Sequence, residues 1–168
     1  MQITLNKNIL IAGALALFST NTIADVYSCS LTVTKVDFGD FYPYNSTPDQ
    51  TTGTVTVTCS KNPLALAVSL SYTITFSAGG SGSMTGRMIY KGINALAYNI
   101  YQNSAYTQIL GNGTGGTYTL TKSYLLPASS FTDNYPVYGR MPVQPLAVPG
   151  TYTDTVIVTL TTSEVLSF

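Results

Sequence analysis

The segment Leu66-Ala67-Val68-Ser69-Leu70-Ser71-Tyr72-Thr73-Ile74-Thr75-Phe76-Ser77 decides the fold class. Apolar and polar side chains alternate along it without a break, which predicts a β-strand with one buried face and one exposed face. A glycine-rich segment, residues 78–83, follows it and predicts a turn. The chain therefore contains a long strand whose apolar face must be covered by another layer of the protein.

The same alternation recurs on both sides of this segment. Residues 27–34 and 53–60 place apolar side chains at every second position, and residues 150–162 do so near the C-terminus. Shorter strands are expected at residues 87–90, 96–102, 116–125 and 135–141. Short strands separated by Gly, Pro and Asn, with no helical period after residue 24, predict an all-β sandwich with Greek-key connections.

Residues 1–24 have the three-part plan of a secretory signal peptide. Lys7 precedes the apolar run 9–18, and the small residues Thr22 and Ala24 flank an expected cleavage site after Ala24. The alternative is a membrane anchor, but this run is much shorter than the roughly 20 residues that span a bilayer. We therefore expect an exported single domain, residues 25–168, with no transmembrane segment.

Export also predicts the state of the two cysteines. In an oxidising compartment, a pair of cysteines with no leftover thiol usually forms a disulfide. Cys29 and Cys59 both fall on the apolar faces of their expected strands. A bridge between them would therefore lie in the core and join the first two strands of the domain.

The composition excludes several classes of function. Only 8% of the residues are charged, with 7 Lys and Arg against 7 Asp and Glu, so the chain has no basic surface for a nucleic acid. It contains no histidine, which removes the Ser/His/Asp and Cys/His nucleophile pairs and the histidine-containing zinc motifs. We therefore expect a structural protein with no cofactor, no metal site and no nucleic-acid partner, and not an enzyme.

Carboxylates are the acid–base groups that remain. A glycosidase needs two of them at a fixed separation, which a β-sandwich could supply. Asp37, Asp40 and Asp133 fall where turns are expected, and aspartate favours turns because it bonds to nearby backbone. A hydrolase that uses these residues or Asp154 is therefore the less favoured interpretation.

The 13 tyrosines and the apolar loops are candidates for binding. Tyrosines on the apolar faces of strands are expected to pack in the core, whereas exposed ones leave open a sugar-binding module. The loops around Leu64, Ile93, Leu146 and Val148 carry large apolar side chains at strand junctions, where turns are usually polar. Exposed apolar patches often mark interaction surfaces, so these four residues are candidate adhesive positions, unless they tuck under the sheets.

Several short motifs occur in the order that one family shows. They are Cys29 followed by residues 38–41 (Phe-Gly-Asp-Phe), residues 53–59 (Gly-Thr-Val-Thr-Val-Thr-Cys), 86–88 (Gly-Arg-Met), 96–101 (Leu-Ala-Tyr-Asn-Ile-Tyr), 137–140 (Val-Tyr-Gly-Arg) and 149–159. With these motifs the chain resembles the spore coat protein U domain family, whose members include subunits of archaic chaperone–usher pili in Gram-negative bacteria. The Trp-Gly that the family often carries is replaced by Leu110-Gly111.

The resemblance implies an incomplete immunoglobulin-like β-sandwich of the pilin type, whose final strand a partner supplies. The implied partners are a periplasmic chaperone, an outer-membrane usher and a neighbouring pilus subunit that donates a strand. The implied route leads through the periplasm to a pilus, the cell surface or the medium. A non-polymerising secreted spore or cell-surface coat protein is the alternative.

The ends of the expected domain suggest its place in a pilus. Residues 25–28, between the expected cleavage site and Cys29, extend at most about 14 Å, whereas a whole strand needs roughly twice that length. Residues 163–168 would have to turn before they could pair. The sequence therefore predicts a subunit that accepts a strand and donates none, which is typical of a tip or minor subunit in adhesion and biofilm formation.

Overall fold

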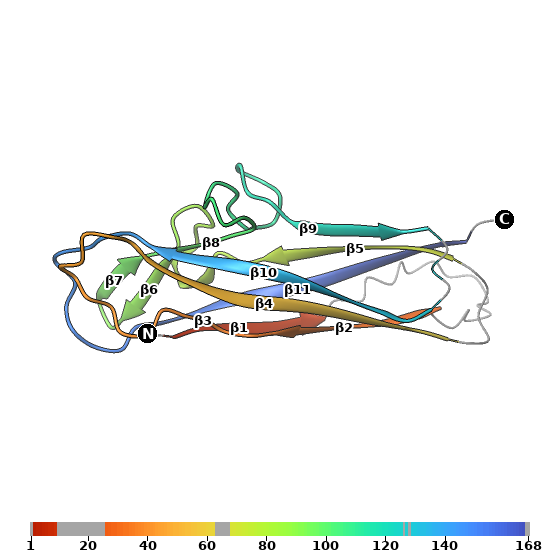
Figure 1. Ribbon diagram of the computed structural model, residues 1–168, viewed down its shortest axis with the longest axis horizontal. Helices are drawn as coiled ribbons and strands as arrows, with labels where there is room; N and C mark the ends of the chain where they lie inside the picture. Colours follow the sequence, from red (N-terminus) through yellow and green to blue (C-terminus); the bar gives the residue numbers. More distant parts are fainter. Residues whose placement is uncertain (1, 10–25, 63–67, 126, 128, 167–168) are drawn as a thin grey trace.

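The computed structural model describes residues 2–9, 26–62, 68–125, 127 and 129–166, which form two β-sheets (Figure 1). Apart from one 3-10 turn, η1 (Gly79–Ser81), these residues contain no helix. In this described part of the chain, no helix is long and apolar enough to cross a membrane. The observed architecture confirms the predicted all-β fold class.

The smaller sheet is antiparallel throughout. Its strand order is β2 (Tyr27–Val33), β4 (Asp49–Lys61), β10 (Phe131–Met141) and β8 (Asn99–Tyr101). The long pairing of β4 with β10 runs from Cys59 opposite Phe131 to Asp49 opposite Met141. This register fixes one end of the molecule near Lys61 and the other near Met141.

The larger sheet has both parallel and antiparallel pairs. Its main path is β3 (Val36–Asp37), β1 (Gln2–Ile9), β11 (Thr153–Leu166), β5 (Val68–Phe76) and β9 (Leu120–Tyr124). A short hairpin of β6 (Met88–Lys91) and β7 (Asn94–Ala97) joins this sheet through β11. The pair of β1 with β11 is parallel, and the other pairs in this sheet are antiparallel.

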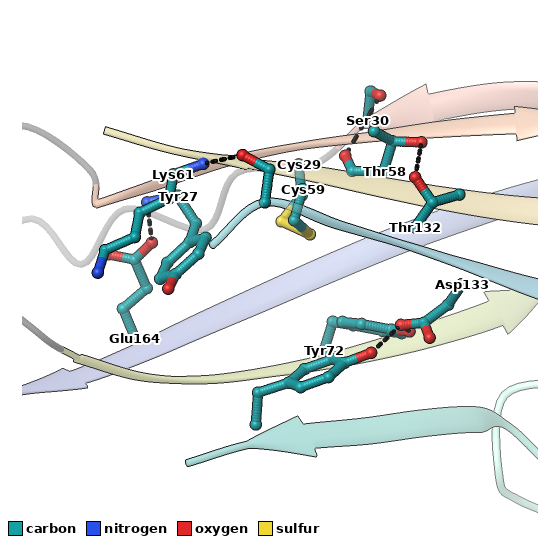
Figure 2. Close-up of a disulfide and its surroundings, with 12 residues drawn as sticks. Tyr27, Cys29, Ser30, Thr58, Cys59, Lys61, Tyr72, Thr132, Asp133 and Glu164 are labelled. Carbon is teal, nitrogen blue, oxygen red and sulfur yellow. Dashed lines mark hydrogen bonds between the residues drawn. A yellow bond between two sulfur atoms is a disulfide. The ribbon is translucent and has the colours of Figure 1, made fainter. Parts of the chain in front are cut away.

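The core lies between the two sheets, as the alternating pattern requires. Every second side chain of β5 is buried, from Val68 to Phe76, and the facing sheet contributes Val55 and Val57 of β4. Tyr72, Tyr98 and Tyr152, which the sequence placed in the core, are buried there. The opposite side chains of the same strands are mostly Thr and Ser, such as Thr58, whose hydroxyl lies 3.3 Å from that of Thr132 (Figure 2). The outer faces of these strands are therefore formed mainly by uncharged hydroxyl groups, which agrees with the small number of charged side chains in the protein.

Two strand predictions need correction. The expected strand 96–102 is divided into β7 and β8, because the chain crosses at Tyr98 from the larger sheet, where β7 pairs with β6, to the smaller sheet, where β8 pairs with β10. The expected turn after residue 162 is wrong, since β11 continues to Leu166, opposite Val68 at the start of β5. A turn at residue 163 would leave the first residues of β5 without a partner on this side.

Candidate strand-accepting edge and apolar end

One edge of β11 is paired with the N-terminal segment of the chain. Residues 2–9 run parallel to β11, from Gln2 opposite Thr153 to Ile9 opposite Leu160, and also contact β3. These residues lie inside the predicted signal peptide, whose cleavage site after Ala24 lies outside the described residues. Removal of residues 1–24 would expose the N–H and C=O groups along this edge of β11. An exposed strand edge of this kind is a template for a strand from another chain.

The start of β2 is fixed to the far end of β11 by one carboxylate. Glu164 accepts hydrogen bonds from the backbone N–H of Tyr27, at 2.7 Å (Figure 2), and from that of Val26, at 3.1 Å. Burial raises the pKa of the Tyr27 phenol, and the negative charge of Glu164 adds to this effect. The part of the chain that follows the predicted cleavage site is therefore held to the sandwich from Val26 onward.

The predicted disulfide is confirmed. Cys29 of β2 and Cys59 of β4 lie directly opposite each other in the antiparallel ladder and are bonded (Figure 2). Cys59 is fully buried, so the bridge reaches the core from the first pair of strands. It holds β2 beside β4, close to the point where Glu164 holds β2 to β11.

Three connections meet at the end of the sandwich that carries Met141. They are the β3–β4 loop, the β6–β7 turn and the β10–β11 loop (Figure 1). Several of their large apolar side chains face solvent, with exposed fractions of 100% for Ile93, 93% for Leu146 and 89% for Tyr44. Tyr42 and Val148 are also exposed. We call these five residues, Tyr42, Tyr44, Ile93, Leu146 and Val148, the apolar end.

The β10–β11 loop is held firmly beneath these side chains. Gln144 makes two hydrogen bonds with the backbone of Ala97, accepting its N–H at 2.7 Å and donating to its carbonyl at 3.1 Å. The Tyr152 hydroxyl donates to the Val148 carbonyl at 2.8 Å, and Lys91 donates to the Pro149 carbonyl at 2.5 Å. A cavity of about 360 Å³ separates this loop from residues 39–43 of the β3–β4 loop. The apolar end is therefore presented on an anchored loop.

The structure brings together three of the four loop residues that the sequence singled out. Ile93, Leu146 and Val148 belong to the apolar end, whereas Leu64 lies outside the described residues. Lys61, where β4 ends, lies at the opposite end of the sandwich, since it pairs with Tyr27. Tyr42 and Tyr44 were missed, although two tyrosines beside Pro43 in an expected loop were a usable signal.

Of the carboxylates that a hydrolase would need, Asp37, Asp133 and Asp154 serve as anchors, and Asp133 lies within β10 rather than in the expected turn. Asp133 accepts the hydroxyl of Tyr72 (Figure 2), accepts that of Tyr124 and pairs with Lys122. Burial acts to raise the pKa of Asp133, but the bonds from Lys122 and the two tyrosines outweigh it and hold the pKa below its usual value. Asp37, also a candidate, accepts the N–H of Gly39 at 3.0 Å, and Asp40 is exposed in the β3–β4 loop.

A second anchor surrounds Asp154. Its carboxylate accepts the Tyr98 hydroxyl at 2.5 Å and the backbone N–H groups of Gly80 and Thr155, each at 2.8 Å. Asp154 and Asp133 are thus both occupied by contacts that hold strands and turns in place. In the described part of the chain, no group of three or more His, Cys, Asp or Glu side chains lies close enough to hold a metal ion.

Arg87, in the Gly-Arg-Met motif, is fully buried. Its guanidinium donates to the carbonyl of Ser77 at 2.7 Å, to that of Met84 at 3.1 Å and to Asn99 Oδ1 at 2.7 Å. Burial lowers the pKa of Arg87 to about 10, against the opposing effects of Tyr98 and Asp154. Arg87 therefore ties the segment after β5 to β8, a structural role that the motif alone did not reveal.

Comparison with known proteins places the chain in a family. The model of the Spore Coat Protein U domain matches residues 14–159, which is most of the chain. The protein belongs to the Spore Coat Protein U domain family. This family and its sandwich fold are structural rather than enzymatic. No curated protein matches the chain.

The chain of this Spore Coat Protein U domain protein also resembles solved structures in its fold. The chain resembles a chain in the CsuC–CsuE chaperone–tip adhesion subunit pre-assembly complex, from archaic chaperone-usher Csu pili of Acinetobacter baumannii, with 24% identity and a TM-score of 0.50. The match covers 80% of this chain and 39% of that one. A weaker likeness, with 16% identity and a TM-score of 0.43, is to a chaperone–tip adhesin complex of CFA/I fimbriae biogenesis and covers 88% and 40%. The first likeness supports the pilin-type sandwich.

Proposed function

We propose that this protein is an exported structural subunit of a chaperone–usher pilus, assembled by donor-strand complementation. The observation that carries the proposal is the edge of β11, which residues 2–9 cover from Thr153 to Leu160. These residues belong to the predicted signal peptide, so the exported domain would carry an open edge. Membership of the Spore Coat Protein U domain family supports the same function.

The proposed partners follow from this open edge. A periplasmic chaperone would cover β11 after export, an outer-membrane usher would receive the complex, and a neighbouring subunit would then supply the missing strand. Strand addition of this kind gains its affinity from backbone hydrogen bonds and its specificity from alternate side chains. The resembled CsuC–CsuE structure is itself a complex of a chaperone and a tip adhesion subunit.

We further propose that the subunit lies at the tip of the pilus or is a minor component. After cleavage at Ala24, the chain would enter β2 almost at once, because Glu164 holds the N–H groups of Val26 and Tyr27. Residues 25–28 are too short to form a strand in a neighbour. The subunit would therefore accept a strand without donating one.

The apolar end is the proposed adhesive surface in cell attachment and biofilm formation. Ile93, Leu146 and Tyr44 are almost fully exposed to solvent, and a group of exposed apolar side chains often marks an interaction surface. Anchoring of the β10–β11 loop through Gln144 and Tyr152 reduces the conformational entropy that adhesion would cost. The exposed apolar side chains and the anchored loop together support contact with apolar surfaces.

Expression of the full chain in a Gram-negative periplasm, with and without a chaperone, tests the assembly. An obligate one-to-one complex with the chaperone is expected, and a stable soluble monomer without it would contradict the pilus function. N-terminal sequencing of the exported protein tests the tip position. Cleavage after Ala24 is expected, whereas a start well upstream would restore a donor segment and exclude the tip argument.

One observation favours the second candidate function, a non-polymerising secreted coat protein. In the structure, the chain covers its own β11 edge with residues 2–9. If these residues stayed with the exported protein, the sandwich would be complete without a partner. The same N-terminal sequencing separates the two functions, because the coat protein requires residues 2–9 to be retained.

A further inference from the structure

A second cavity lies on the side of the sandwich, where the β6–β7 hairpin meets the edge strand β8. Its volume is about 400 Å³, and its walls include Met88, Ala97, Tyr101, Arg140 and Pro142. This volume lies in the range of pockets that hold small ligands. None of the described residues that line it is acidic. The cavity therefore combines an apolar wall, a phenol and a cation.

Arg140 is the unusual member of this set. Its guanidinium lies 5.3 Å from the centre of the Tyr106 ring, and none of the described carboxylates is within ion-pair distance of it. Arg87 also borders the cavity, but its guanidinium is committed to the carbonyls of Ser77 and Met84 and to Asn99. Arg140 is therefore the cation of this cavity that has donors to offer to an anion.

The surrounding aromatic rings hold Arg140 in position. Tyr106 packs edge-to-face on Tyr101, with ring centres 5.4 Å apart, and on Tyr138, with ring centres 6.4 Å apart. The backbone of Tyr106 has a φ of 56°, in the left-handed region that side-chain-bearing residues seldom adopt. Such strain persists where the surroundings impose it, and it is common at binding sites.

The loop that carries Tyr106 is built to maintain this conformation. Asn103 accepts the N–H of Tyr106 through its backbone carbonyl, at 3.1 Å. Its side-chain oxygen accepts the N–H groups of Thr107 and Gln108, each at 3.1 Å. Tyr106 is thus a positioning residue, whose ring is held beside the Arg140 guanidinium.

The same loop decides which class of ligand can bind. It covers the edge of β8 that faces away from β10. Tyr101 bridges to Ile109, and the Gln102 N–H donates to the Gln108 carbonyl at 2.9 Å. A peptide cannot add to β8 as a further strand, because those backbone groups are already used. A ligand of this cavity must instead be recognised through side chains.

We propose that this cavity binds a carboxylated sugar, a hexuronic acid residue either free or within a polysaccharide. The carboxylate would accept two N–H groups of Arg140, a geometry that the planar guanidinium favours. The sugar ring would pack on Tyr101, with Met88 and Pro142 completing the apolar wall. The site is separate from the β11 edge and from the apolar end, and it does not depend on pilus assembly.

Titration of the full chain with D-glucuronate, an oligomer of glucuronate, D-glucose and a glutamate-rich peptide tests the site. Calorimetry or NMR shifts should show binding of glucuronate and at least about tenfold weaker binding of glucose, since a charge-assisted hydrogen bond contributes roughly 1.5–3 kcal/mol. If only the oligomer binds, the ligand is a polysaccharide; if both bind, it includes the free sugar. Tighter binding of the peptide, equal binding of glucose, or no binding of either glucuronate form would overturn the proposal.

Variants separate a binding role from a structural one. R140Q should weaken glucuronate binding about tenfold or more, and R140K, which keeps the charge without the fork, should retain part of it. Y106A should weaken binding less than R140Q, because it disturbs only the position of the guanidinium. K35Q, which removes a cation elsewhere on the surface, is the matched control and should bind normally. If R140Q unfolds, glucuronate binding by R140K tests the role of Arg140 instead. Unchanged binding by both R140K and Y106A would exclude the site.

Discussion

The carboxylate of Glu164 accepts the backbone N–H of Tyr27 at 2.7 Å, although the two residues lie 137 positions apart in the chain. The same carboxylate accepts the N–H of Val26. Since β2 belongs to one sheet and β11 to the other, this single side chain fastens the two sheets where the expected exported chain begins.

We expect E164A to lower the free energy of unfolding by about 1.5–3 kcal/mol, because two N–H groups lose a charged acceptor. E164Q, which keeps one acceptor oxygen, should lose less. Urea unfolding of the purified full chain, in which residues 2–9 cover the edge of β11, measures both values. D40A, which removes an acid from the exposed β3–β4 loop, is the control, and an equal loss in D40A would contradict the role of Glu164.

The anchor at Asp133 predicts how stability depends on pH. Because the folded pKa of Asp133 lies below its usual value, its ionised form is stabilised by folding. The stabilisation by ionised Asp133 is fully present above the pKa of the unfolded state, about 3.9. It is lost as the pH falls through the lower pKa of the folded state.

Urea unfolding between about pH 2 and pH 6 measures this dependence. D133N should remove that part of the acid slope, and Y124F should reduce it by removing one donor to the carboxylate. Y138F, a tyrosine outside the Asp133 cluster, should leave the slope unchanged. An acid slope that is identical in D133N and the natural chain would refute the assignment.

Loss of the disulfide between Cys29 and Cys59 should destabilise the domain. The bridge closes a loop with a sequence separation of 30, for which chain entropy predicts about 3–4 kcal/mol. The double variant C29S/C59S should lose roughly this amount in urea unfolding under oxidising conditions. Reduction of the natural chain should reproduce the loss, whereas the double variant should not respond to the reductant.

Substitutions at the apolar end should reduce adhesion without affecting folding. I93S and L146S change side chains that are almost fully exposed, so we expect unfolding free energies within about 0.5 kcal/mol of the natural value. Retention of the protein on polystyrene or another apolar surface should fall, most strongly in the double variant.

Leu125 provides the matched control for this experiment. It is 84% exposed but follows β9, outside the apolar end. L125S should therefore adhere as well as the natural chain. If L125S and I93S/L146S lost adhesion equally, retention would reflect general surface hydrophobicity and the proposed location would be wrong.

Much of the fold was predictable because the signal for a strand is local. Alternation in residues 27–34, 53–60 and 68–76 identified three strands and their buried faces. It also placed Cys29 and Cys59 on faces that could meet. Boundaries were less certain where the tertiary structure decided them, as at Tyr98, where the chain crosses from the larger sheet to the smaller one and the hydroxyl donates to Asp154.

The candidate sites were predictable only in part. Ile93, Leu146 and Val148 could be recognised as apolar residues in loops, but nothing in the sequence said that their loops share one end with Tyr42 and Tyr44. The proposed role of Arg140, in β10, was equally hidden, since it depends on the ring of Tyr106 from the loop after β8. Contacts of this kind depend on how distant segments are brought together.

The sequence by itself determined an all-β domain with few ions, no histidine and one disulfide. Those features follow from composition and from a two-residue period, which a strand keeps wherever it is placed. The tertiary structure alone decided which strand edges are covered, which loops share an end, and which polar groups meet. These outcomes depend on strand register and on the crossovers between two sheets, so they arise only when residues far apart in the chain, such as Tyr27 and Glu164, become neighbours.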